Sequence, residues 1–114
     1  MEIEQLTIEK IREGLEKKEF SATDLVSEFF KKIEKEDKKI KAFLHLTKEL
    51  AFSKAKEIDE KVKEKIKLPP LAGVPCAIKD NILVKDVLCT AGSKILENYV
   101  APFDAFCVEK LKEA

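Results

Sequence analysis

Apolar residues recur at helical spacing through the first part of the chain. Ile8, Ile11 and Leu15 fall at i, i+3 and i+7, which predicts one stripe of a helix over about 8–18. Thr7 is the expected N-cap, because its hydroxyl can accept a hydrogen bond from a backbone N–H that has no partner within the first turn. The pattern therefore predicts a short amphipathic helix at the beginning of the chain.

A second helix is predicted from Ser21 onward. Ser21 and Asp24 resemble a capping box, with Asp in place of the usual Glu. The apolar face that follows is wide and consists of Leu25, Val26, Phe29, Phe30 and Ile33. We expect this helix to pack against the first one as an αα-hairpin.

A third helix is predicted over about 48–65, after a short strand or extended connector at 40–46. Thr47 is the expected cap. The inner side is formed by small and branched apolar residues, namely Ala51, Ala55, Ile58 and Val62. The Lys and Glu residues of the other side are interpreted as a solvated face with some i,i+4 pairs.

The amino-acid composition of the chain changes near residue 68. Charged residues number 33 in 1–67 and 11 in 68–114, and the second segment holds all four prolines and all three cysteines. We therefore divide the chain into a helical segment, 1–67, and a loop-rich segment, 68–114. The apolar run 74–78 predicts a buried strand that ends in polar residues.

Shorter elements are expected in the rest of the second segment. Residues 82–84 predict a further extended piece, 90–93 a turn, and 94–98 a helical turn. Asp104 is the expected cap of a last helix. The inner positions of that helix would be Ala105, Val108 and Leu111.

Composition and charge exclude several classes of protein. The chain has 114 residues, one domain at most, and 22 basic against 22 acidic side chains. Zero net charge argues against a protein that binds nucleic acid by neutralising phosphates. No apolar run approaches the length of about 18 residues that a membrane span needs, and the N-terminus lacks a signal-peptide core. We expect a soluble, intracellular, cytoplasmic protein.

The three cysteines do not suggest a disulfide framework or a metal site. Cys76, Cys89 and Cys107 are widely spaced, and with His45 they form no close pair of ligands of the kind that zinc sites contain. We interpret them as small buried apolar residues and expect no metal.

Residues 69–114 resemble the beginning of the amidase signature family. The resemblance rests on the run PLAGVP that ends at Pro75, the apolar run into Lys79-Asp80-Asn81, and Thr90-Ala-Gly-Ser93. It continues through Pro102-Phe-Asp-Ala105 and Val108-Glu-Lys-Leu111. The resemblance implies an α/β fold in which N-terminal amphipathic helices lead into the first strands of a mixed sheet, incomplete within this chain.

The resemblance also implies a Ser–cis-Ser–Lys amidase and assigns the catalytic lysine to Lys79. A lysine that acts as a base must spend time neutral, and burial favours the neutral amine, which suits the end of a buried strand. Asp80, Asn81, Thr90 and Ser93 are expected to support the active site, and for Thr90 and Ser93 a turn-capping role is an equal alternative. For Asp80 and Asn81 we favour a structural role, in which they bond backbone donors in the turn after the strand.

The two catalytic serines are not expected within this chain. Ser21, Ser27, Ser53 and Ser93 are isolated from one another, and the chain holds only three glycines, so no Gly/Ser-rich stretch is present. We therefore expect the N-terminal portion of a longer enzyme. On that interpretation the 114 residues alone are inactive.

The branch of the family that the chain resembles most supplies ammonia for converting Glu-tRNA(Gln) to Gln-tRNA(Gln). That resemblance implies glutamine as substrate and two other subunits in a heterotrimer, one of which binds most of the tRNA. It implies no cofactor in this chain, and ATP and Mg²⁺ for the activation step that a partner subunit catalyses. Two alternatives remain: a stand-alone amidase for other small amides, and a non-catalytic helical interaction module.

Overall fold

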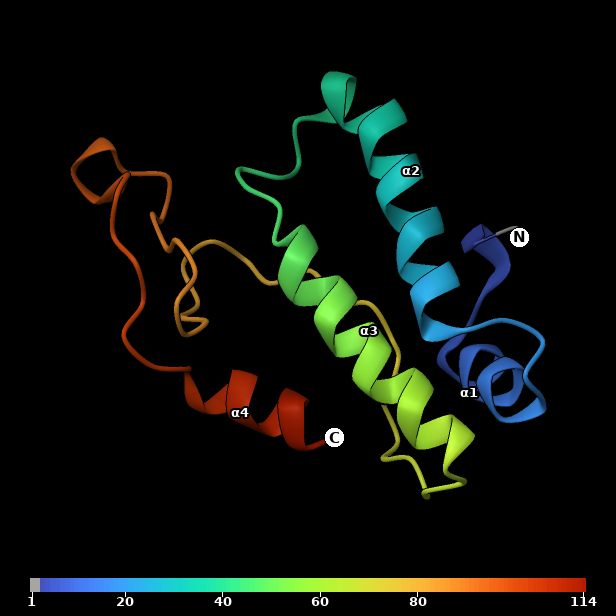
Figure 1. Cartoon of the computed structure of the whole chain (residues 1–114). Helices are drawn as coiled ribbons and strands as arrows, with labels where there is room; N and C mark the ends of the chain where they lie inside the picture. The colour runs from blue at the N-terminus through green and yellow to red at the C-terminus, as the bar shows by residue number, and fades with distance from the viewer. Residues whose placement is uncertain (1–2) are drawn as a thin grey trace. The chain divides into compact units, whose positions relative to one another are not determined.

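The computed structural model describes residues 3–114, which form two compact units (Figure 1). One unit ends at Pro75 and the other comprises Cys76–Ala114, so the structural division falls slightly after the change in composition. The first unit contains a 3₁₀-helix and three α-helices: η1 (Ile3–Gln5), α1 (Ile8–Lys17), α2 (Ala22–Ile40) and α3 (Lys48–Lys63). The second contains η2 (Lys94–Leu96) and α4 (Phe106–Glu113).

The caps predicted for the first two helices are confirmed. The Thr7 hydroxyl accepts a hydrogen bond from the backbone N of Lys10 at 3.3 Å. The capping box of α2 is complete, because the Ser21 hydroxyl accepts from the Asp24 backbone N at 2.9 Å and the Asp24 carboxylate accepts from the Ser21 backbone N at 3.0 Å. Local sequence thus determines where both helices begin.

The core of the first unit is built from three helices. Its buried side chains are Ile11 and Leu15 of α1, Ala22, Leu25, Val26 and Phe30 of α2, and Ala55 of α3. The rings of Phe30 of α2 and Phe52 of α3 stack with centroids 5.9 Å apart. The Lys and Glu residues of α3 lie on its exposed side as predicted, and Lys54 pairs with Glu57.

The predicted partner of α2 is wrong. α2 packs chiefly along α3, which lies beside it in Figure 1, whereas α1 contributes mainly Ile11 and Leu15 to the shared core. The physical reason is the surface of α3, where Ala51 and Ala55 let the two long helices approach closely. α1 has only 10 residues against 19 in α2, so it can cover only a part of that helix.

Asp59 of α3 adds a second, cross-helix cap to α2. Its carboxylate accepts from the backbone N of Ala22 at 2.7 Å, the backbone N of Thr23 at 3.1 Å and the Thr23 hydroxyl at 2.5 Å. A carboxylate is well suited to the positive end of a helix. α3 itself ends at Lys63, two residues earlier than predicted, and Thr47 makes no side-chain cap bond.

The mixed sheet implied by the resemblance is not formed in residues 3–114, where the structure has no strand and one isolated antiparallel bridge, Leu88 to Val100. The run 74–78, predicted as a buried strand, is irregular, and Cys76 and Ala77 are exposed. The piece at 82–84 is likewise not a strand. Of the two alternatives for 40–46, the connector is confirmed for 41–46, which has no regular secondary structure, whereas Ile40 is the last residue of α2. A strand needs a neighbour for its backbone groups, and no segment in the described part of the chain pairs with 74–78.

The second unit instead consists of turns and two short helices. The turns predicted at 90–93 and after Ser93 are confirmed, the latter as η2. The cap predicted for the last helix is wrong: Ala105 precedes α4, and the Asp104 carboxylate accepts from the backbone N of Lys85 at 2.8 Å. A backbone donor on a distant loop therefore competes successfully for this carboxylate.

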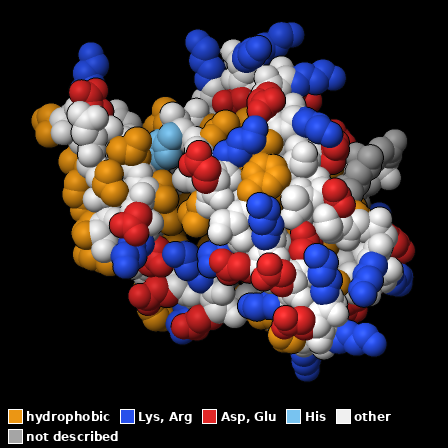
Figure 2. Space-filling view, in the orientation of Figure 1, with side chains coloured by type: hydrophobic (Ala, Val, Ile, Leu, Met, Phe, Trp, Pro, Cys, Tyr) orange, Lys and Arg blue, Asp and Glu red, His pale blue; other side chains and the backbone are white. Residues whose placement is uncertain are grey.

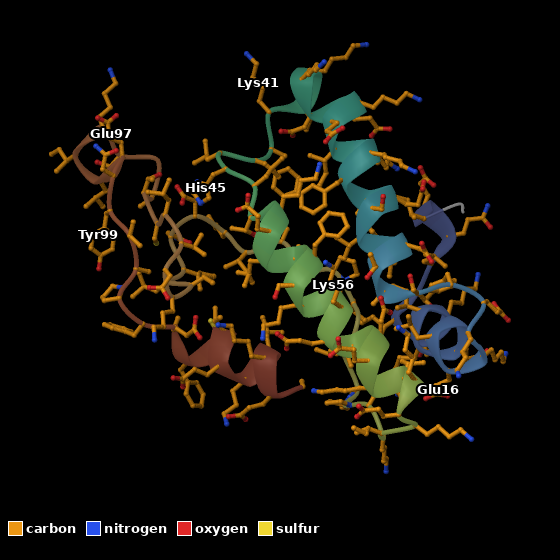
Figure 3. The ribbon with its side chains drawn as sticks, viewed as in Figure 1. Glu16, Lys41, His45, Lys56, Glu97 and Tyr99 are labelled. Atoms are coloured by element: carbon orange, nitrogen blue, oxygen red, sulfur yellow. The ribbon has the colours of Figure 1, made fainter. Side chains whose placement is uncertain are left out.

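Several apolar side chains of the second unit are exposed. Ile95 is 94% exposed and Phe106 is 73% exposed. Figure 2 shows hydrophobic side chains gathered over this unit, and Figure 3 shows Tyr99 pointing away from its own loop. Cys89 is buried as predicted, whereas Cys76 and Cys107 are exposed, so the expectation of three buried cysteines is wrong.

Residues 3–114 contain neither a candidate membrane span nor a candidate metal site. No helix there is long and apolar enough to cross a membrane. No three His, Cys, Asp or Glu side chains of these residues come together in a way that could hold a metal ion.

Candidate active site

Lys79, the predicted catalytic lysine, lies at the beginning of a tight turn in the second unit. Its carbonyl accepts a hydrogen bond from the backbone N of Ile82 at 3.0 Å, which closes the turn. The side chain of Lys79 is exposed. The expectation of an amine sheltered at the end of a buried strand is therefore not met by these residues, because the covering strands are absent from them.

Asp80 collects hydrogen bonds from a loop ten residues further along the chain. Its carboxylate accepts from the backbone N of Thr90 at 3.0 Å, from the Thr90 hydroxyl, and from the backbone N of Gly92 at 3.5 Å. Its carbonyl accepts from the backbone N of Ala91 at 2.8 Å and from Cys89 Sγ at 3.5 Å. Asp80 therefore joins the turn that begins at Lys79 to the segment 89–92.

The loop held by Asp80 has an unusual backbone. Ala91 and Gly92 are consecutive residues with positive φ, 49° and 67°. Glycine adopts this region readily, but alanine does so at a cost of about 1–2 kcal/mol. The hydroxyl of Thr90 also accepts from the backbone N of Gly92 at 3.2 Å, and the Thr90 carbonyl accepts from the backbone N of Ser93 at 2.8 Å. These bonds hold the strained loop in place.

All five predicted site residues lie in the turn 79–82 or in the segment 90–93, where the Thr90 carbonyl accepts from the Ser93 backbone N. Among these five, Asp80 and Thr90 make hydrogen bonds between the turn and the segment. Asn81 is exposed, and Ser93 is half-buried at the start of η2, where its side chain makes no cap bond. The backbone-fixing role favoured for Asp80 has a clear geometric counterpart, but that of Asn81 does not.

Two participants were not singled out by sequence reasoning. The Gly92 amide and the Cys89 thiol both point to residue 80, the first to its carboxylate and the second to its carbonyl. Neither has a local sequence signal, because the partner lies 12 or 9 residues away in the chain. The only hint is the glycine within Thr-Ala-Gly-Ser, a residue that often marks a backbone with positive φ.

These residues lie in a segment that matches a known family. The model of the Amidase family matches residues 24–114, which is most of the chain, so the chain belongs to the amidase family. The match begins in α2 and therefore includes two helices of the first unit as well as the whole second unit.

The curated relatives carry a more particular name, that of the A subunit of glutamyl-tRNA(Gln) amidotransferase. The protein of that name from Natranaerobius thermophilus is 45% identical over the whole chain, and that from Carboxydothermus hydrogenoformans is 46% identical. A third, from Fusobacterium nucleatum, is 47% identical over 96% of the chain. The chain spans about a quarter of the length of these relatives, 22–24%.

A solved structure shares the fold closely. It is described as an unexpected vestigial protein complex that reveals the evolutionary origins of an s-triazine catabolic enzyme. Its TM-score is 0.89 at 35% sequence identity, over 95% of this chain and 24% of the other. An inhibitor-bound form of that complex matches equally well.

Proposed function

We propose that the chain is the N-terminal portion of a glutamine-hydrolysing amidase subunit, which supplies ammonia for converting Glu-tRNA(Gln) to Gln-tRNA(Gln). The observation that carries the proposal is the 45–46% identity, over the full 114 residues, to proteins that bear the name of the A subunit of that amidotransferase. The name of those relatives implies further subunits, and we extend that implication to the complete protein. The exposed apolar side chains of the second unit are consistent with a larger assembly.

In this proposal Lys79 is the catalytic base. A nucleophilic serine and a bridging serine, both from sequence outside these residues, would complete the site. The bridging serine would pass its proton to the Lys79 amine while it takes the proton of the nucleophile, whose oxygen attacks the carboxamide carbon. The C–N bond then breaks, ammonia leaves with the returned proton, and water hydrolyses the acyl-enzyme to glutamate.

The exposed amine of Lys79 defines what the rest of such a protein must provide. A charged amine cannot accept a proton, and water stabilises the charge. We propose that strands of the complete protein pair with the run 74–78, cover Lys79, and complete the mixed sheet. Backbone N–H groups near the nucleophile would then stabilise the oxyanion of the tetrahedral intermediate.

Activation of the tRNA-bound glutamate is proposed to belong to another subunit, which would use ATP and Mg²⁺. This chain has 22 basic and 22 acidic side chains and no excess of positive charge for binding the tRNA backbone. A cytoplasmic location follows from the proposed role in aminoacyl-tRNA synthesis. No cofactor is proposed for the amidase reaction itself.

The test is Lys79→Ala in the full-length protein, with its partner subunits. We expect glutamine hydrolysis to fall by about 10²–10⁴-fold, because a proton-transferring side chain contributes roughly that factor. ATP-dependent activation of Glu-tRNA(Gln) should persist. Lys94→Ala is the matched control, since Lys94 is another exposed lysine of the same unit. Glutamine hydrolysis at a near-normal rate in the Lys79→Ala protein would contradict the assignment.

A stand-alone amidase for other small amides is the second candidate. It is favoured by the 35% identity and TM-score of 0.89 to the complex linked by its description to s-triazine catabolism. The two candidates differ in whether amide hydrolysis is coupled, through partner subunits, to the amidation of Glu-tRNA(Gln). A transamidating subunit should hydrolyse glutamine and deliver ammonia to Glu-tRNA(Gln) when its partners are present, whereas a stand-alone amidase should show higher kcat/KM for another amide and need no partner.

A further inference from the structure

Five hydrogen bonds from the loop 89–92 end on one residue of the turn that begins at Lys79, namely Asp80. The backbone N–H groups of three consecutive residues, 90, 91 and 92, all reach it. The Thr90 hydroxyl and the Cys89 thiol add two more bonds. Both the side chain and the carbonyl of Asp80 thereby accept hydrogen bonds from the same loop.

This arrangement restrains the residue immediately before it. Lys79 is joined by its carbonyl group to Asp80, the residue that the loop holds. The Lys79 carbonyl also accepts a hydrogen bond from the backbone N of Ile82 at 3.0 Å. The backbone of Lys79 therefore cannot rotate without breaking bonds to the loop or the turn. Residues held in sparsely populated conformations, as Ala91 is, persist where the surroundings over-determine them, and such places cluster at active sites.

We propose that Asp80 and Thr90 act as a positioning pair for Lys79. The pair fixes the direction in which the lysine side chain leaves the backbone, so that its amine meets the bridging hydroxyl. This inference rests on the proposed function and deepens it. Neither Asp80 nor Thr90 touches the substrate in this proposal, and both act only through the geometry of Lys79.

The bond between the Thr90 hydroxyl and the Asp80 carboxylate is the part of this arrangement that substitution can remove most cleanly. Asp80 and Thr90 are both half-buried, and a hydrogen bond to a charged group is stronger than one between neutral groups. Thr90→Val keeps the shape of the side chain but removes this bond and the acceptor for the Gly92 amide. Thr90→Ser keeps both, and therefore serves as the conservative rescue.

The experiment compares Thr90→Val, Thr90→Ser and Asp80→Asn in the full-length protein with its partner subunits, and glutamine hydrolysis is followed across pH. We expect kcat to fall about 10–100-fold in Thr90→Val, the factor that loss of a hydrogen bond to a charged group would produce, with KM changed less than about twofold. The rising limb of the kcat–pH profile should move to higher pH, because a misplaced amine is better hydrated and retains its proton. Thr90→Ser should restore both properties, and Asp80→Asn should lie between.

Asp86→Asn is the matched control, since Asp86 is an exposed aspartate of the same unit with a positive φ that asparagine tolerates. A Thr90→Val protein that loses thermal stability but keeps the kcat and pH profile of the wild type would overturn the inference, as would an equal effect of Asp86→Asn. If Thr90→Val does not fold, as judged by circular dichroism, Asp80→Asn decides in the same assay: a shifted profile supports the inference and an unshifted one overturns it.

The result is separable from that of the parent proposal. If Lys79→Ala leaves glutamine hydrolysis intact, the proposed function fails whatever the positioning pair does. If Lys79→Ala abolishes hydrolysis while Thr90→Val matches the wild type, the positioning inference alone fails.

Discussion

The two units of this chain are stabilised in different ways. In the first, apolar side chains from three helices form one cluster, with Leu15 and Leu25 almost completely buried. In the second, only Cys89, Ala101 and Val108 are buried, and the turns are held by hydrogen bonds that end on Asp80 and Asp104. The first unit is thus ordered by the burial of apolar side chains, and the second by hydrogen bonds to a few carboxylates. We therefore expect the two units to lose stability through different substitutions.

Leu25→Ala should have the largest effect on stability. Leu25 is fully buried at the centre of the first unit. Its truncation should lower the free energy of unfolding by about 2–5 kcal/mol, through lost burial and a residual cavity. The measurement is urea-induced unfolding followed by circular dichroism at 222 nm.

Leu111→Ala is the control for that prediction, because Leu111 is 42% exposed in α4 of the second unit. Leu111→Ala should lower the free energy of unfolding by well under half as much as Leu25→Ala does. Equal losses in the two variants would break the comparison, since they would mean that both units depend on apolar burial to the same degree.

Asp59→Asn should have an intermediate effect. The carboxylate of Asp59 caps α2 through three hydrogen bonds, and asparagine retains only one acceptor oxygen and no charge. We expect a loss of about 1–2 kcal/mol in the free energy of unfolding, typical of a cap or a charged hydrogen bond. Glu57→Gln is the matched control, because the Lys54–Glu57 pair is exposed and such pairs contribute about 0–1 kcal/mol. If Glu57→Gln lowered the free energy of unfolding as much as Asp59→Asn, the loss would not be specific to the cross-helix cap and the prediction would be wrong.

A pH dependence of the second unit should be the smallest effect. The hydrogen bond from Lys112, and next the one from the Lys85 backbone, lower the pKa of Asp104 below its ordinary value of 3.8. A carboxyl with a lowered pKa stabilises the fold above its unfolded pKa. That contribution should decline as the pH falls below about 4, through the folded-state pKa. Native-state hydrogen exchange of the Lys85 amide between about pH 5 and pH 3 measures it.

Asp104→Asn supplies the control for this titration. The variant should show reduced protection of the Lys85 amide at about pH 5 and no further change on acidification beyond that of the whole chain. If wild type and variant respond identically to pH, Asp104 does not link protonation to the order of this unit.

The helices of the first unit were predictable because their signals are local. Thr7 and the Ser21–Asp24 box each cap the helix that follows them directly, and the apolar stripe of α2 supplies most of the buried residues of that helix. The pairing of α2 with α3 was not predictable from these signals. Helical periodicity identifies an apolar face but does not name the partner that covers it.

The candidate site was predictable in part. The resemblance selected Lys79, Asp80 and Thr90, and the structure joins the turn and the loop that carry them. The strand at 74–78 was inferred from an apolar run alone. Such a run does not show whether a neighbouring strand exists to pair with it. The predicted capping role of Asp104 was wrong for a related reason. A carboxylate before a helix can accept a hydrogen bond from another nearby backbone donor, here the backbone N of Lys85.

The order of residues along this chain was sufficient to specify the three α-helices of the first unit, the caps of α1 and α2, and the family, because each depends on neighbours within a few positions or on many matched residues in succession. The choice of α3 as the partner of α2, the cap from Asp59 and the convergence of the loop 89–92 on Asp80 emerged only from the folded arrangement. Those features depend on hydrogen bonds and packing between segments well separated in the chain, whose relative placement no local pattern encodes.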